Sequence, residues 1–362
     1  MFVAWRDLRF AKGRFALMGS VIVLITLLVG LLSALTAGLA RANTSALTGL
    51  PADHLSFARP PAGQSVSFTA SSVGERQWRA LADRPGIESA QPIGISTVNA
   101  EAGHHTAAVS AFGVRPRSGL APGETAPGTA VLSQRAADDL GARPGDRVSL
   151  SGTTLRVSAV AGDASYSHTP VVWIDLGDWQ HVAPGGQRAG ERSGERATVI
   201  ALRTGSGADL AAADRAAGTE TRTVDGALEA IGSYQAENGS LQLMRGFLFV
   251  ISAMVIGAFF TVWTIQRSGD IAVLKALGSS TPYLLRDALG QAVIMLVGGT
   301  ALGTVLAALI GAFVPDSVPF VMEPLTTIGP AVVMTVLGAA GAALSIRRIT
   351  AVDPLTALGS AR

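Results

Sequence analysis

Four long apolar stretches without a single Asp, Glu, Lys or Arg constrain this chain more than any other feature. They cover residues 15–40, 246–266, 288–314 and 325–346. Each exceeds the roughly 18 residues at which an apolar run indicates a membrane-spanning helix. Only 15% of the chain is charged, against about 25% in an average soluble domain. We therefore predict four transmembrane helices at these positions.

The first stretch also resembles a secretory signal peptide, because basic residues precede it and the small residues Ala40 and Ala42 imitate a cleavage site. Its apolar core is much longer than the roughly 7–15 residues of a signal peptide. We expect it to be retained as a transmembrane helix.

The charges between the stretches predict an orientation. Segments 1–14, 267–287 and 347–362 carry ten Lys or Arg against four acidic residues, whereas segments 41–245 and 315–324 carry eighteen against twenty-two. Short basic flanks stay in the cytoplasm. We expect a cell-membrane protein with both termini in the cytoplasm, a cytoplasmic amphipathic lead-in at 1–14, a large outer domain at 41–245 and a short outer loop at 315–324.

The long outer segment has a mixed pattern. Runs rich in β-branched residues, bounded by Gly, Pro and Asp, predict strands, and apolar residues at helical spacing predict helices. The expected fold is therefore an α-helical four-span bundle with a large α+β extracytoplasmic domain between spans 1 and 2. The predicted strands cover residues 65–69, 106–114, 129–132, 147–150, 154–160 and 170–174, and the predicted helices cover 75–82, 133–140, 208–217 and 225–237.

Two further segments of the outer region have distinct patterns. Residues 184–196 are rich in Gly and Arg and predict a flexible loop. The return to the membrane, DGALEAIGSYQAENGSLQLMRGF, has apolar residues at helical spacing that Asn238, Gly239 and Ser240 interrupt. Asn-Gly can end one helix and Ser240 can cap the next. We expect a stalk with a joint at this point.

Small residues recur inside the third stretch. Gly299 and Gly303 form a G-x-x-x-G pair, and Gly311 continues the spacing. Such residues let two helix backbones approach closely in a membrane. Packing within the bundle is the simpler interpretation, and a dimer interface is the alternative.

Several kinds of chemistry are missing. The chain has no cysteine, which excludes disulfides and thiolate metal sites. Neither lysine follows a glycine, so no P-loop is present. The paired His104 and His105 follow Gly103 and indicate a hairpin tip rather than a metal site. The spans lack the ionisable groups of a proton relay, and the basic residues form no patch for nucleic acid. We predict a non-enzymatic protein that takes energy from a partner.

One short segment between spans two and three has a pattern of its own. In RSGDIAVLKALGSS, the apolar residues Ile271, Leu274 and Leu277 line one helical face, and Asp270 and Lys275 lie elsewhere. A helix of this kind buries its apolar face in a lipid interface or in a groove on a partner.

This segment resembles the cytoplasmic coupling segment of FtsX/MacB-type ABC transporter permeases. The lead-in Trp5-Arg6-Asp7-Leu8-Arg9 and the ending Asp353-Pro354-Leu355 are also similar to that family. The family has one span, a large outer domain and three further spans, so the resemblance covers essentially the whole chain.

The resemblance implies partners. A separate cytoplasmic ABC ATPase, in two copies, would dock on the coupling segment. A second permease copy would form a homodimer with this chain in the lipid membrane, since one four-span chain supplies half of the usual set of spans. ATP hydrolysis would then occur on the ATPase subunit. The coupling residues implied are Asp270, Ile271, Val273, Leu274, Lys275, Ala276, Leu277 and Gly278.

Within the family, residues 162–170 and 233–238 resemble the haem-exporter permeases of the HrtB type. Tyr, His and Met can be axial ligands of haem. The candidate ligand-binding residues are Tyr234, Glu237, Met244, Tyr166 and His168. No covalently bound cofactor is expected, and haem would be the transported substrate. In the alternative interpretation, Tyr234 packs the stalk and Met244 faces lipid.

Two other hypotheses remain open on the sequence. One is a mechanotransmitting regulator whose outer domain activates a cell-wall hydrolase, as in FtsX. The other is an efflux permease for lipids, peptides or antibiotics.

Overall fold

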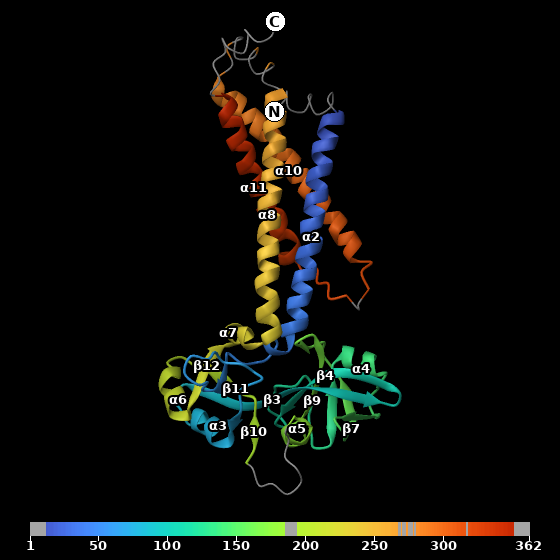
Figure 1. Ribbon diagram of the computed structural model, residues 1–362, viewed down its shortest axis with the longest axis vertical. Helices are drawn as coiled ribbons and strands as arrows, with labels where there is room; N and C mark the ends of the chain where they lie inside the picture. The colour runs from blue at the N-terminus through green and yellow to red at the C-terminus, as the bar shows by residue number, and fades with distance from the viewer. Residues whose placement is uncertain are drawn as a thin grey trace. The chain divides into compact units, whose positions relative to one another are not determined.

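The computed structural model describes residues 12–184, 194–266, 269, 273, 278, 280–315 and 318–350. The chain divides into two units, which we call the domain, residues 39–239, and the helical unit, residues 1–38 with 240–362 (Figure 1). Most of the lead-in, most of the coupling segment, residues 351–362 of the tail and residues 185–193 of the predicted loop lie outside the described residues.

Four long helices account for the predicted spans. They are α2 (Lys12–Thr48), α8 (Gly232–Gln266), α10 (Thr281–Gly311) and α11 (Pro324–Thr350). All four are long and apolar enough to cross a membrane. The first residues of α10 include Pro282, which suits the first turn because its missing N–H would have no helical partner there.

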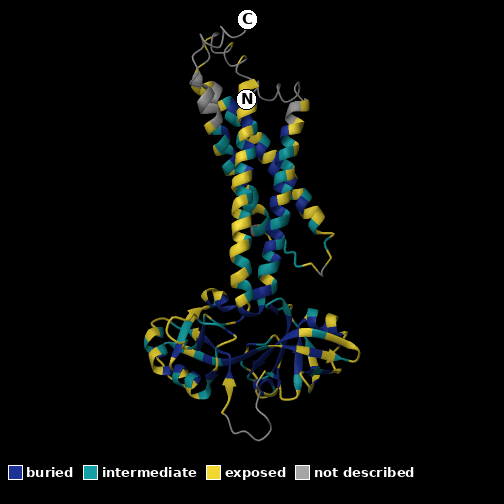
Figure 2. Cartoon of the chain, viewed as in Figure 1, coloured by how far each residue is buried: buried dark blue, intermediate teal, exposed yellow. Residues whose placement is uncertain are grey.

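The helical unit has a narrow core and a wide apolar surface. Its buried cluster joins α2, α8, α10 and α11 through residues such as Ile22, Phe260, Leu296 and Met334. Many large apolar side chains of the same helices are exposed, as the yellow segments of Figure 2 show. An apolar surface of this extent requires lipid or another apolar partner.

The predicted joint in the stalk is wrong. Helix α8 runs without a break through Asn238, Gly239 and Ser240. A glycine inside a helix costs only about 1 kcal/mol relative to alanine, and strong helix-forming residues follow it. The helical hydrogen bonds on both sides outweigh this local preference for a break.

A ten-stranded, mostly antiparallel sheet forms the centre of the domain. Its main path runs β12-β1-β11-β3-β4-β9-β5-β7-β6, and β8 pairs with β9. The strands of this sheet are β1 (His54–Ala58), β3 (Ile87–Ala102), β4 (His105–Val114), β5 (Thr129–Leu132), β6 (Arg147–Leu150), β7 (Thr153–Val160), β8 (Ser165–Tyr166), β9 (Thr169–Asp175), β11 (Val199–Thr204) and β12 (Thr219–Thr223). A separate ribbon pairs β2 (Val73–Gly74) with β10 (Arg196–Ala197).

Both faces of this sheet are covered. Four short helices pack against one face of the sheet and share an apolar cluster with it. They are α3 (Glu75–Ala82), α4 (Gln134–Leu140), α5 (Leu176–Val182) and α6 (Leu210–Ala217). The other face packs against the end of α2, Phe68, α7 (Val224–Ala227) and the short helix η1 (Leu228–Ala230). The α+β prediction for this region is confirmed.

Most of the individual predictions in the domain are confirmed within a few residues. The strand predicted at 65–69 is wrong, because that segment pairs with no strand and instead inserts Phe68 into the core. The helix predicted at 225–237 is interrupted at Ile231, which has an extended backbone. Strand β3 was not predicted, because Pro92 and Gly94 interrupt its pattern. Pro92 fits because pairing with β4 begins only at Ile93.

Candidate functional site

A two-residue hairpin turn carries Ser167 and the candidate ligand residue His168. Strands β8 and β9 pair through Ser165 with Pro170 and Tyr166 with Thr169, which leaves Ser167 and His168 as the loop. Their φ angles are 50° and 66°. Two-residue hairpins of this handedness normally use Asn-Gly, because residues with a Cβ are strained at positive φ. The chain therefore keeps Ser and His here at a cost in stability.

The end of α2 holds this turn in place. The N–H of Ser167 donates to the carbonyl of Asn43 at 3.0 Å, and the N–H of His168 donates to the carbonyl of Ala42 at 3.1 Å. The N–H of Ser165 donates to Ser45 Oγ at 2.9 Å. These backbone contacts fix the positions of the Ser167 and His168 side chains.

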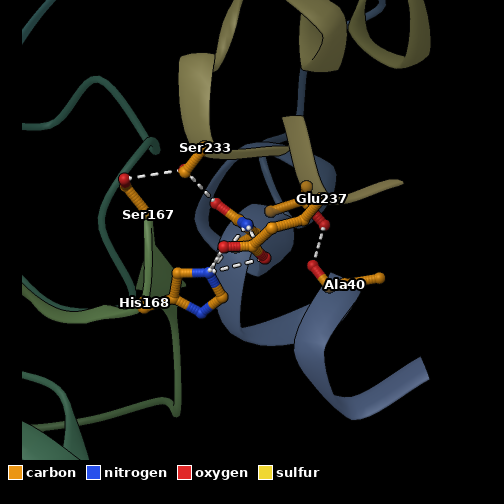
Figure 3. Close-up of polar contacts among 7 residues, drawn as sticks. Ala40, Ser167, His168, Ser233 and Glu237 are labelled. Carbon is orange, nitrogen blue, oxygen red and sulfur yellow. Dashed lines mark hydrogen bonds and ion pairs between the residues drawn. The ribbon is translucent and has the colours of Figure 1, made fainter. Parts of the chain in front are cut away.

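Asn43 connects the turn to the first residues of α8, and Figure 3 labels Ser167, His168, Ser233 and Glu237 around these contacts. Its Oδ1 accepts a hydrogen bond from Ser233 at 2.7 Å, and its Nδ2 donates to Glu237 at 3.2 Å. The hydroxyls of Ser233 and Ser167 lie 2.9 Å apart. Asn43 is fully buried. We call these five residues, Asn43, Ser167, His168, Ser233 and Glu237, the polar cluster.

His168 and Glu237 form the exposed side of the polar cluster. Nε2 of His168 lies 3.1 and 3.0 Å from the two carboxylate oxygens of Glu237. Their side chains are 35% and 42% exposed. Nε2 also lies 2.9 Å from Nδ2 of Asn43. When Nε2 carries the proton it donates to Glu237, and the Asn43 amide donates to the same carboxylate.

This arrangement leaves the other imidazole nitrogen available. Nδ1 of His168 has no hydrogen-bond partner within the described part of the chain, and in Figure 3 it points away from Glu237. A histidine that binds a metal usually donates its second ring N–H to a carboxylate, which fixes the tautomer. No group of three His, Asp or Glu side chains gathers within the described ranges. Within the described residues the cluster therefore offers one imidazole nitrogen and no three-ligand metal site.

The other candidate ligand residues lie in different surroundings. Tyr234 is half-buried against the apolar cluster under the sheet. Tyr166 is buried and makes edge-on contacts with Phe68 and Phe112. Burial raises the pKa of the Tyr166 phenol, because the charged form would lose its hydration. Met244 belongs to the helical unit, where its side chain is exposed.

Little of the coupling segment is described. Val273 is helical and exposed, and Gly278 lies in a turn with φ of 91°. Asp270, Ile271, Leu274, Lys275, Ala276 and Leu277 lie outside the described residues.

The three glycines of α10 lie at close contacts within the helical unit. A Cβ on Gly299 would come within 2.7 Å of Ile22, and one on Gly303 within 2.7 Å of the Val23 carbonyl oxygen. A Cβ on Gly311 would lie 2.4 Å from the sulfur of Met322. Gly299 and Gly303 therefore permit the approach of α10 to α2.

Sequence analysis did not identify Asn43, Ser167 or Ser233. No motif marks these residues, because Asn43 and its partner Ser233 are 190 residues apart along the chain. The one local signal is Ser-His in a tight turn where glycine would be preferred, and it becomes visible only when the hairpin register is known.

Two sequence families match the chain. The family described as MacB-like periplasmic core domain matches residues 16–219, which is more than half of the chain. The family described as FtsX-like permease C-terminal matches residues 243–354.

Full-length relatives are found in staphylococci. A protein of Staphylococcus epidermidis (strain ATCC 35984), provisionally named hemin transport system permease protein HrtB, is 27% identical over 369 residues and is aligned over 99% of both chains. A protein of Staphylococcus haemolyticus with the same provisional name is 27% identical over 365 residues, again over 99% of both chains. Among solved structures, the periplasmic region of MacB from Actinobacillus actinomycetemcomitans is 12% identical, covers 49% of this chain and 92% of its own, and has a TM-score of 0.35.

Proposed function

This chain belongs to the family of FtsX/MacB-type ABC transporter permeases, and from this membership we propose that it is the permease subunit of an ATP-driven exporter of haem or another hydrophobic small molecule. Permeases of this family are not themselves ATPases and work with a partner ATPase subunit. The chain is accordingly a multi-pass protein of the cell membrane with four apolar helices.

The proposed assembly contains two copies of the permease and two of the ATPase. The apolar surface of α8, α10 and α11 supports it, because so narrow a core leaves wide faces for lipid and for a second copy. In this proposal the ATPase docks on residues 267–287, with Val273 presented to it, and closure of the ATPase dimer moves the spans. Both termini lie in the cytoplasm.

The single observation that carries the cargo proposal is the full-length similarity to proteins named as hemin permeases. The polar cluster supports it chemically. Haem iron takes only one or two axial ligands from a protein, and histidine is among the commonest. His168 would supply Nδ1, and Glu237 would hold its tautomer through Nε2.

A haemin titration of the purified, detergent-solubilised protein tests this proposal. We expect a saturable shift of the Soret band. Loss of a carboxylate that supports a metal ligand typically lowers metal affinity about 10- to 100-fold, and loss of the ligand itself lowers it more. The affinity for haemin should therefore fall at least about tenfold in His168→Gln, and by a smaller factor in Glu237→Gln than in His168→Gln. Tyr234→Phe and Met244→Ala test the other two accessible candidates.

The matched control is His181→Gln, which removes an exposed histidine from the end of α5. It should bind haemin like the wild type. Unsaturable partitioning that is the same in every variant would make the cargo proposal wrong. The chain would then be a permease for lipids, peptides or antibiotics, or a regulator of a cell-wall hydrolase.

A further inference from the structure

The domain contains a second candidate site, a pocket of about 430 Å³ that we call the Trp179 pocket. Tyr166 and four segments surround it: residues 68–72, residues 95–97 of β3, the end of α5 with residues 183–184, and residues 196–198. Helix α5 and strand β10 both contact β3, beside which Figure 1 shows them. The volume falls within the roughly 300–1,000 Å³ of small-molecule sites.

A pair of glycines seats the indole ring of Trp179. Gly94 and Gly113 face each other across β3 and β4. A Cβ on Gly94 would lie 2.2 Å from the ring, and one on Gly113 would lie 2.4 Å from the Cβ of Trp179. Any larger residue at either position would displace the indole. The two glycines therefore leave space on the sheet for one aromatic ring, which forms part of the pocket wall.

Hydrogen bonds tie the walls of the Trp179 pocket together. Ser71 Oγ accepts from the N–H of Ala58 at 3.0 Å and donates to the carbonyl of Thr198 at 2.7 Å. Thr198 Oγ1 accepts from the N–H of Ile95 at 2.7 Å. Gln180 donates to the carbonyl of Arg196. These bonds join all four segments, so the pocket is largely formed before any ligand arrives.

Other polar groups of the pocket have no hydrogen-bond partner among the described residues. Trp179 is only 8% exposed, and its indole N–H makes no hydrogen bond to any described residue. Buried indole N–H groups usually have a partner, because an unsatisfied one destabilises the folded state. The hydroxyls of Tyr166, Ser96 and Thr97 also make no hydrogen bond within the described ranges.

The charge of the lining is one-sided. Among the described residues that line it, Arg196 is the only charged one, and none is Asp or Glu. Phe68, Tyr166 and Trp179 add aromatic surface. The lining therefore combines one cationic side chain and several hydrogen-bond donors with flat aromatic surfaces.

We propose that the Trp179 pocket binds a small amphipathic anion, with a flat apolar body against Phe68 and Trp179 and a carboxylate or similar acceptor group bound by Arg196 and the unpartnered donors. A site with one cation and several hydrogen-bond donors favours an anionic acceptor group over a neutral amide. The lining shares no residue with the polar cluster, and the proposal does not depend on haem as cargo.

Calorimetry on the full-length protein in lipid nanodiscs tests the proposal, with 2-naphthoate as the probe and neutral 2-naphthamide as its matched analogue. Empty nanodiscs give the partitioning background. We expect saturable naphthoate binding, at least about tenfold tighter than naphthamide, because charge-assisted hydrogen bonds are roughly twice as strong as neutral ones. Arg196→Gln should weaken naphthoate binding by about tenfold, so that the affinities for the two probes become similar.

Arg147→Gln, which removes an exposed arginine of β6, is the matched control and should bind like the wild type. Trp179→Phe keeps a ring on the glycine pair but removes the N–H, and it should weaken naphthoate while the thermal midpoint shows that the domain still folds. Equal binding of the two probes, or equal loss in Arg196→Gln and Arg147→Gln, would overturn the proposal. So would heats indistinguishable from those of empty nanodiscs.

Discussion

Ser167 and His168 hold a backbone conformation that costs a residue with a Cβ roughly 1–3 kcal/mol. Both are half-buried, and both place polar side chains in the polar cluster. The partly exposed ion pair of His168 and Glu237 contributes only about 0–1 kcal/mol to the stability of the fold. Stability alone therefore does not account for His at this turn, whereas a role for its imidazole does.

Glycine and alanine at position 168 should separate strain from side-chain contacts. Both variants lose the imidazole, but only His168→Ala keeps the strain of positive φ. We expect His168→Gly to be more stable than His168→Ala by about 1 kcal/mol. Thermal unfolding of the detergent-solubilised protein measures the difference.

The same comparison at an unstrained position of the cluster serves as the control. At Ser233, in the first turn of α8, the order should reverse, since glycine is the poorer helix former. Equal stability of the two variants at position 168 would show that the turn relaxes on substitution and stores no strain.

Helix α10 approaches α2 at its small residues. A Cβ on Gly303 would lie 2.7 Å from the Val23 carbonyl oxygen and 2.8 Å from Cβ of Thr26. Gly298, in the same helix, has no atom within 4 Å of such a Cβ. Contact of this kind stabilises helices in lipid, where hydrophobicity does not drive them together.

We expect Gly303→Val to destabilise the helical unit by about 1–3 kcal/mol, because overpacking forces the two helices apart. Gly298→Val should fold like the wild type, with at most a small effect of helix propensity. The thermal midpoints of the two purified variants measure this difference. Comparable loss in both would mean that valine acts through the helix itself and not through contact with α2.

Local patterns predicted elements well when their signals lie within the element. Helix α3 shows this, with an apolar face and polar flanks over residues 75–82. Strand β3 was missed because its pairing partners, and not its own sequence, make Pro92 and Gly94 acceptable. For the polar cluster, the sequence indicated His168 and Glu237 as candidate ligands, because their side chains can bind a metal. The buried Asn43 that joins them could not be predicted, because only the fold brings it to these two residues.

The absence of cysteine from the chain makes its membrane orientation directly measurable. Ser65 is exposed in the domain and Val273 is exposed in the coupling segment, so Ser65→Cys and Val273→Cys each introduce a single accessible thiol. Because basic segments remain in the cytoplasm, a membrane-impermeant maleimide should label Ser65→Cys in intact cells and Val273→Cys only after permeabilisation. The cysteine-free parent gives the background. The opposite pattern would place the coupling segment outside, where no ATPase could drive it, and the exporter proposal would fail with the orientation.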